Sequence, residues 1–205
     1  MNISSEQKKM VIALLLVAVL SALILAITDR FTREPIAEAI RQTTMKALMK
    51  VLPEHANDPL TDRVTEDGTN YYVARNADGK VLAFAWQQVA PDGYNGSIYI
   101  LIGVDNTGKT VGIRITKHKE TPGLGDAITK DMTWLASFSG HTLDTQHWAV
   151  KKDGGDIDQF TGATITPRAV VAAVYKGLQK FVKNKQEILA KARFLQTLET
   201  QKKQP

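Results

Sequence analysis

The stretch Ser97–Thr116, SIYILIGVDNTGKTVGIRIT, decides how the middle of this chain is expected to fold. Its two ends, Ser97 to Val104 and Thr110 to Thr116, are rich in β-branched residues, which favour strands. The polar segment Asp105 to Lys109 separates them and contains a glycine. Two strand-like runs joined by a short glycine-containing loop predict an antiparallel hairpin.

A second hairpin is predicted upstream of this one. The runs Tyr71 to Arg75 and Lys80 to Gln87 are strand-like, and residues 76–79 between them form an Asn-Ala-Asp-Gly turn. The preceding segment, Asn57 to Asn70, is polar and is expected to be irregular. Two consecutive hairpins predict an antiparallel sheet.

Helical periodicity lies on either side of these hairpins. Glu34 to Leu52 predicts an amphipathic helix with a break near Pro35 and a stop at Pro53. Asp126 to Phe138 predicts a short helix, and Pro167 to about Gln196 predicts a long one with an apolar face. Strands followed by helices indicate an α+β fold, an antiparallel sheet with flanking helices.

Composition excludes several classes of function. The net charge of +5 is mild, and there is no basic stripe with interleaved aromatic residues, so nucleic-acid binding is not expected. The chain has no cysteine, which excludes disulfides, thiolate nucleophiles and iron–sulfur clusters built from it. Its four histidines lack metal-ligand spacing. No Gly-x-Gly-x-x-Gly follows a strand, so a Rossmann dinucleotide site is not expected either.

An apolar segment precedes the predicted domain. Met10 to Ile27 is an uncharged run of 18 residues, which as a helix spans about 27 Å and so approaches the roughly 30 Å hydrocarbon core of a bilayer. The competing interpretation is a cleaved signal peptide, but the run is longer than a usual signal core and no clear Ala-x-Ala site follows it. We expect a short N-terminus at residues 1–9, a transmembrane anchor at 10–27 and one exported domain at 28–205.

A hydroxyl-rich turn, Asp158-Gln159-Phe160-Thr161-Gly162-Ala163-Thr164, runs into the last predicted helix. Thr166 is expected to cap that helix, and Pro167 suits its first turn, where a missing N–H costs nothing. Free backbone N–H groups and the positive end of the helix dipole make such a terminus an anion site. A phosphate held at Thr164 would lie close to it. The alternative is an ordinary N-terminal turn.

A second loop follows the hairpin of residues 97–116. It reads His118-Lys119-Glu120-Thr121-Pro122-Gly123-Leu124-Gly125-Asp126. Pro122 fixes its own φ, and Gly123 and Gly125 allow the backbone to approach a flat ring closely. Taken alone, it is also consistent with an ordinary Pro-Gly turn.

Together with residues 147–156 and Ala90-Pro91-Asp92-Gly93-Tyr94, these two motifs resemble the G subunit of the Rnf electron-transport complex, the RnfG (RsxG) family. The turn at 158–164 resembles that family's Asp-x-x-(Ser/Thr)-Gly-Ala-Thr signature. The related C subunit of the sodium-pumping NADH:quinone reductase shares the flavin motif but is usually longer. The resemblance extends from the anchor to about residue 180.

This resemblance implies a cofactor and a set of site residues. FMN would be joined to Thr164 by a phosphoester bond that a flavin transferase makes from FAD. Asp158, Thr161, Gly162 and Ala163 would form the attachment turn. The cofactor-binding loop would contribute Glu120, Thr121, Gly123 and Leu124, which would lie against the isoalloxazine ring.

The resemblance also implies a place for the protein. It would be a single-pass protein of the bacterial inner membrane with its large domain on the periplasmic side. The positive charges on the two sides of the apolar run are nearly equal in number, so charge alone does not decide this orientation. It would relay electrons with the other Rnf subunits in a translocase that couples NADH and ferredoxin to ion movement, with no catalytic residue of its own. The alternative is a flavin-free, membrane-anchored envelope binding module that uses Trp86, Tyr94, Trp134 and Trp148 as exposed anchors.

Overall fold

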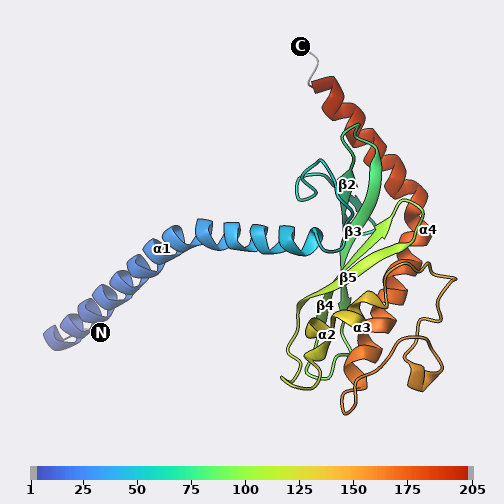
Figure 1. Ribbon diagram of the computed structural model, residues 1–205. Helices are drawn as coiled ribbons and strands as arrows, with labels where there is room; N and C mark the ends of the chain where they lie inside the picture. The colour runs from blue at the N-terminus through green and yellow to red at the C-terminus, as the bar shows by residue number, and fades with distance from the viewer. Residues whose placement is uncertain (1–3, 203–205) are drawn as a thin grey trace. The chain divides into compact units, whose positions relative to one another are not determined.

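The computed structural model describes residues 4–202, and the side chains of residues 4–197 (Figure 1). The chain forms two compact units, residues 1–44 and 45–205. The first unit is almost entirely helical, and the second contains a five-stranded antiparallel sheet and its flanking helices. The predicted α+β class is confirmed.

Helix α1 spans Ser5–Leu48 and includes the apolar anchor. It is the one helix among the described residues that is long and apolar enough to cross a membrane. The helix continues through Pro35 and ends at Leu48, so the expected break near Pro35 and the end at Leu52 were wrong. A proline removes one backbone hydrogen bond, and the bonds on either side keep the helix intact here.

The sheet has the strand order β1-β2-β3-β4-β5. Its strands are β1 (Arg63–Glu66), β2 (Thr69–Arg75), β3 (Val81–Ala90), β4 (Ile98–Asp105) and β5 (Thr110–Lys117). Both predicted hairpins are confirmed, as β2–β3 and β4–β5. Strand β1 was missed, because residues 57–70 were expected to be irregular.

A two-residue turn joins the missed strand, β1, to β2. Glu66 pairs with Thr69, and both Asp67 (φ +46°) and Gly68 (φ +70°) between them lie in the left-handed region. Positive φ at both central positions defines the type I′ turn, and Asp-Gly is among its preferred sequences. The signal was therefore present in the sequence, inside a segment that its polar composition made look like a loop.

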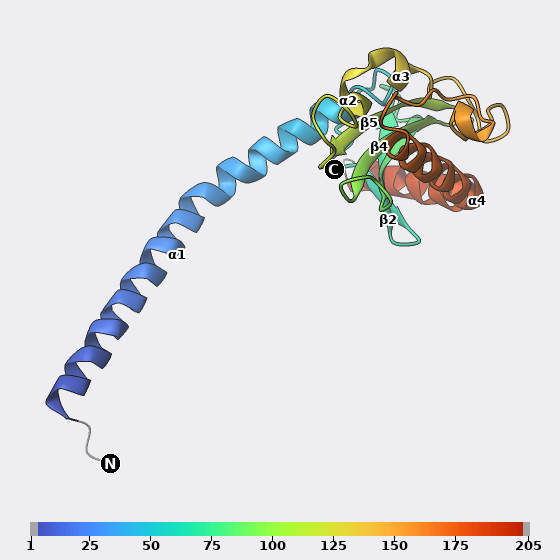
Figure 2. The ribbon, with the colours of Figure 1, turned by 90° about the horizontal axis from the view of Figure 1, so that it is seen from below.

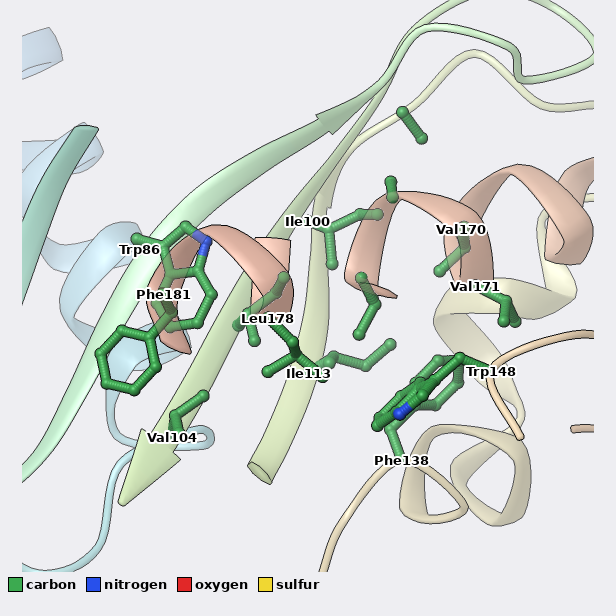
Figure 3. Packing of buried hydrophobic residues seen from close by; sticks show 14 of the residues in the cluster. Trp86, Ile100, Val104, Ile113, Phe138, Trp148, Val170, Val171, Leu178 and Phe181 are labelled. Carbon is green, nitrogen blue, oxygen red and sulfur yellow. The ribbon is translucent and has the colours of Figure 1, made fainter. Parts of the chain in front are cut away.

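Successive side chains along each strand point to opposite faces of the sheet, and each face has its own hydrophobic core. On one face, Tyr71, Phe84, Trp86 and Ile102 pack with residues of the last helix, α4 (Ile165–Lys202), among them Phe181 (Figure 3). The Trp86 and Phe181 rings stack with centroids 5.2 Å apart. The opposite face is smaller and is covered by the chain that follows α1; its core residues are Leu48, Val51, Leu52, Ala74, Ala83, Ala85 and Leu101.

Two short helices, α2 (Ala127–Lys130) and α3 (Met132–Ala136), adjoin strand β5 (Figure 2). They replace the single helix expected over residues 126–138. Asp131 ends α2 and caps α3, because its backbone is extended and its carboxylate accepts the Trp134 N–H at 2.9 Å. A short 3-10 helix, η1 (Lys151–Asp153), lies in the following loop.

The tryptophans belong to the core. Trp86, Trp134 and Trp148 are 1%, 4% and 8% exposed, so they cannot serve as the surface anchors that the flavin-free alternative requires. Tyr94 alone of that group is exposed, at 65%. This removes most of the residues on which the alternative depended.

Candidate functional site

Three loops meet at the N-terminal end of α4: residues 91–97 between β3 and β4, residues 118–126 after β5, and residues 158–164 before α4. Asn95 links the first two, because its backbone N–H donates to Glu120 Oε1 at 3.1 Å and its amide donates to Thr121 Oγ1 at 3.0 Å. Thr166 links the second loop to the helix by donating its hydroxyl to Glu120 Oε2 at 2.5 Å. The two sequence motifs predicted to meet therefore lie together.

The attachment turn is a tight reverse turn. The Ala163 N–H donates to the Phe160 carbonyl at 3.1 Å, and Gly162 has φ +79°. A type II turn needs this positive φ at its third residue, which is why glycine stands there. The Phe160 ring packs on Trp134 with centroids 5.2 Å apart, and Trp134 Nε1 donates to the Asp158 carbonyl at 2.8 Å. The buried Trp134 thus holds the attachment turn by one ring contact and one hydrogen bond.

The loop after β5 contains a second turn of the same kind. The Leu124 N–H donates to the Thr121 carbonyl at 3.2 Å, with Pro122 and Gly123 between them. Gly123 has φ +79°, and its N–H donates to Asp126 Oδ1 at 2.8 Å. The hydrogen bond from Lys130 lowers the pKa of Asp126 below its ordinary value, so this carboxylate stays charged at neutral pH.

The two turns approach each other closely. A Cβ built on Gly162 would lie 3.7 Å from Leu124 Cδ2, which is ordinary van der Waals contact. Gly125 is more constrained, because a Cβ there would lie 2.7 Å from Glu120 Oε2 and 2.8 Å from Thr166 Oγ1. The site is therefore assembled by contacts that leave no room for a side chain at residue 125.

Thr164 occupies the N-cap position of α4. The helix begins at Ile165, and the Thr164 carbonyl accepts the Arg168 N–H at 3.3 Å. The expectation that Thr166 caps the helix was wrong: it is the second helical residue, and its hydroxyl serves Glu120 instead. Pro167 does lie in the first turn. Thr164 is partly exposed, and its hydroxyl has no hydrogen-bond partner within the described part of the chain.

Charged groups surround this terminus. Arg168 donates to both carboxylate oxygens of Asp153, at 2.5 and 2.8 Å, which joins η1 to the first turns of α4. The same hydrogen bond lowers the pKa of Asp153 and raises the pKa of Arg168. Asp158 pairs with Lys151 at 2.7 Å, and both side chains are largely exposed.

The candidate site is an open surface. Thr161, Gly162, Gly123 and Leu124 are all exposed. A surface cavity of about 350 Å³ lies elsewhere, bordered by the two hairpin turns and the C-terminal half of α4; its lining includes Lys80, Asn106 and Arg193. A cofactor at Thr164 would therefore lie beside this exposed surface.

Comparison with known proteins identifies the family. The FMN-binding domain family matches residues 93–179, and the RnfG N-terminal region matches residues 1–51. The G subunit of an ion-translocating oxidoreductase complex from Pseudomonas aeruginosa is 43% identical over 182 residues, covering 82% of this chain and 85% of that protein. The chain belongs to the RnfG family.

A second relative and a solved structure were also compared with this chain. The G subunit of an ion-translocating oxidoreductase complex from Shewanella oneidensis is 39% identical over 192 residues, 86% of this chain and 90% of that protein. Among solved structures, the C subunit of a Na⁺-translocating NADH-quinone reductase from Parabacteroides distasonis is 23% identical. It matches with a TM-score of 0.48 over 65% of this chain and 77% of that one.

Sequence reasoning missed part of this candidate site. Asn95 bridges two loops and was not singled out, although its Asn-Gly pair is a turn signal. Ile165, which is 49% exposed, adds an apolar side chain beside the attachment turn. Glu120, expected at the cofactor, is only 4% exposed. Among the side chains of residues 4–197, no group of His, Asp or Glu residues could hold a metal ion.

Proposed function

We propose that this chain is a membrane-anchored flavoprotein subunit that carries FMN in a phosphoester bond to Thr164 and relays electrons within an Rnf-type ion-translocating oxidoreductase complex. The observation that carries the proposal is the Thr164 hydroxyl. It stands partly exposed at the N-cap of α4, beside a glycine turn, with no hydrogen-bond partner in the described part of the chain.

The attachment reaction needs an available hydroxyl and room beside it. Thr164 Oγ1 would attack the FMN-side phosphorus of FAD, forming the O–P bond while the pyrophosphate bond breaks. AMP leaves, and the threonine proton is lost to a base of the flavin transferase or to solvent. Gly162 and Ala163 give the reacting phosphorus space, since neither carries a side chain larger than a methyl group.

The helix terminus suits the product. A phosphodiester at Thr164 carries one negative charge, and the positive end of the α4 dipole stabilises an anion placed there. The N–H groups of Ile165 and Thr166 precede the first intrahelical bond, which Arg168 makes. Pro167 lacks an N–H, so two backbone donors of the first turn are offered instead of three.

Exposed apolar side chains suit the isoalloxazine ring. Leu124 is 47% exposed and lies near enough to the attachment turn that a Cβ on Gly162 would touch it. Ile165 follows Thr164 directly and is 49% exposed. FMN supplies the electron chemistry, while the protein supplies the covalent tether, the orientation and the local polarity.

Asp158 is proposed to serve loading rather than electron transfer. Its exposed carboxylate pairs with Lys151 and lies on the surface that a transferase would contact. The flavin content of Asp158→Ala tests this role, and a fully loaded variant would contradict it.

The cellular setting is proposed from family membership. In an inner-membrane complex α1 would cross the bilayer once, with residues 1–9 in the cytoplasm and the domain at 28–205 in the periplasm. The partners would be the other Rnf subunits, the surrounding lipid and, during maturation, the flavin transferase. Reaction with a membrane-impermeant reagent at a cysteine placed on either side of α1 tests the orientation.

The direct test of covalent attachment is the mass of the intact protein from a host that contains the transferase. We expect the mass to rise by that of FMN less one water in the unsubstituted chain. Thr164→Ala should lose this increment completely, while the control Thr61→Ala, at an exposed threonine outside the attachment turn, should keep it. Retention of flavin by Thr164→Ala would contradict the proposal.

A further inference from the structure

Glu120 is a buried carboxylate that joins three separate parts of the site. It is 4% exposed, and both of its oxygens are used. Oε1 accepts the Asn95 N–H at 3.1 Å, and Oε2 accepts the Thr166 hydroxyl at 2.5 Å. These partners lie 25 and 46 residues away in the sequence, so the carboxylate connects the 91–97 loop, the 118–126 loop and α4.

Thr166 is equally buried, at 1% exposure, and lies two residues after Thr164. A threonine in the first turn of a helix can use its hydroxyl within its own backbone. Here the hydroxyl is directed to Glu120 instead, which fixes the first turn of α4 to the neighbouring loop. Movement of that turn would move the Thr164 hydroxyl with it.

The hydrogen bond between Glu120 and Thr166 is enclosed by the backbone around it. A Cβ on Gly125 would come within 3 Å of both Glu120 Oε2 and Thr166 Oγ1, so the backbone at residue 125 closes over the hydrogen bond. The carboxylate is therefore shielded from the surface where Leu124 and Gly162 are exposed. Both oxygens of Glu120 accept hydrogen bonds from within the protein.

We propose that Glu120 and Thr166 are a positioning pair that sets the Thr164 hydroxyl for flavin transfer. The inference rests on the proposed function. The pair does not touch the reacting atoms: it holds the first turn of α4 against the 118–126 loop, so that the attachment turn and the apolar Leu124 keep one relative geometry. Small displacements of a reacting group cost large factors in rate.

The test measures initial rates of flavin loading with purified transferase and FAD, per folded molecule. Glu120→Gln replaces one of the two accepting oxygens by an NH2 donor and removes the charge, and Thr166→Val removes the donating hydroxyl, so each should lower kcat of the transferase about 10- to 100-fold. Its KM for the protein should change little. Thr166→Ser keeps the hydroxyl and should restore the rate to within about threefold. The double variant should be no slower than the slower single variant, since the two residues share one interaction.

Thr110→Val is the matched control. Thr110 is a buried threonine whose hydroxyl has no partner in the described chain, so the same substitution removes no hydrogen bond there. Its loading rate should equal that of the parent. A fall in this control comparable to Thr166→Val would show that any buried threonine change disturbs loading and would overturn the inference.

A second readout needs no flavin. In a Thr164→Ala background, amide hydrogen exchange at Ala163 and Leu124 should accelerate at least about tenfold in Thr166→Val, while core strand amides stay protected. Normal hydrogen exchange in Thr166→Val, together with normal loading in Glu120→Gln and Thr166→Val, would contradict the positioning role of the Glu120–Thr166 pair and leave the proposed function intact. Loading that falls only in proportion to the unfolded fraction of the protein would also contradict the positioning role. Absence of FMN from the unsubstituted protein would instead contradict the proposed function, and this inference with it.

Discussion

Helix α4 is held in two different ways along its length. Cations join its middle and its C-terminal part to the sheet: Arg75 of β2 donates to the Ala192 carbonyl at 2.8 Å, Lys180 pairs with Asp67 at 3.1 Å, and Lys185 donates to the Thr107 carbonyl at 2.8 Å. The first turn at its N-terminal end depends on one buried hydrogen bond, Thr166 to Glu120, and one ion pair, Arg168 with Asp153.

This difference separates stability from function. Arg75, which donates to the Ala192 carbonyl of α4, also forms a buried ion pair with Asp62, with side chains 6% and 10% exposed. The N-terminal end exposes its hydroxyl and its glycine turns to solvent. We therefore expect substitutions at the first region to change the free energy of unfolding, and substitutions at the second to change flavin loading and potential.

The largest expected effect is on stability. Asp62→Ala should lower the free energy of unfolding by about 3–5 kcal/mol, because it leaves the buried Arg75 guanidinium without its partner. Urea denaturation measures this. Lys180→Ala, which breaks an exposed pair, should cost about 0–1 kcal/mol. Equal effects in the two variants would remove the distinction between the buried Asp62–Arg75 pair and the exposed Lys180–Asp67 pair.

Gly125→Ala should disturb both properties. The added methyl would lie within 3 Å of Glu120 Oε2 and Thr166 Oγ1, so the hydrogen bond must be displaced. We expect a loss of about 1–3 kcal/mol in unfolding free energy and loading slowed about tenfold.

The control for this substitution is Gly112→Ala in β5. There the nearest atom to a new Cβ is Ser139 Oγ at 3.5 Å, an ordinary contact. Loading should be normal in this variant. A Gly125→Ala protein that loads as fast as the parent would show that the Glu120–Thr166 contact can move without consequence.

Leu124→Ala and Thr121→Ala should alter the flavin without removing it. Attachment depends on Thr164, so the bound FMN should remain stoichiometric, while the change in apolar contact and polarity at the ring shifts its reduction potential. A shift of up to about 30 mV corresponds to about 1.4 kcal/mol for a two-electron couple. Spectroelectrochemistry measures it. Val182→Ala, an exposed apolar residue farther along α4, is the control; potentials equal to the parent in all three would place this loop away from the flavin.

The smallest expected effect is a pH dependence. The pKa of Asp126 is lowered in the folded protein by the hydrogen bond from Lys130, so its contribution to stability is present above the ordinary aspartate pKa and is lost as pH falls through the lowered value. Asp126→Asn should therefore show a shallower loss of stability below about pH 4 than the parent. If the unfolding free energies of the two proteins fell identically below about pH 4, this carboxylate would not stabilise the Gly123 turn.

Local patterns were enough to predict most of the elements. The hairpins were readable because β-branched runs flank Asp/Asn/Gly turns, and α4 was readable from its apolar face. Strand β1 was not, since its signal is only the Asp67-Gly68 turn inside a polar segment. The continuity of α1 through Pro35 was also missed, because a proline forbids one hydrogen bond but leaves the rest of a long helix to continue.

The site was predictable in its motifs and not in its internal contacts. Thr164 and Gly162 stand in a turn whose hydroxyls and glycine are visible in the sequence, and Leu124 was named from the family resemblance. The Glu120–Thr166 hydrogen bond could not, because it joins residues 46 positions apart and depends on the burial of both. The family resemblance implies that Glu120 lies against the ring, and in the fold this carboxylate is buried and accepts hydrogen bonds from Asn95 and Thr166.

Peptide mapping of the protein purified from a host with the transferase tests the central claim most directly. Digestion should release one flavin-bearing peptide, and fragmentation should locate FMN on Thr164 at the N-cap of α4. The same map of Thr164→Ser should show the flavin on the serine, because the hydroxyl is retained. Flavin on Thr161 or Thr166, or a chain that carries none, would contradict the account.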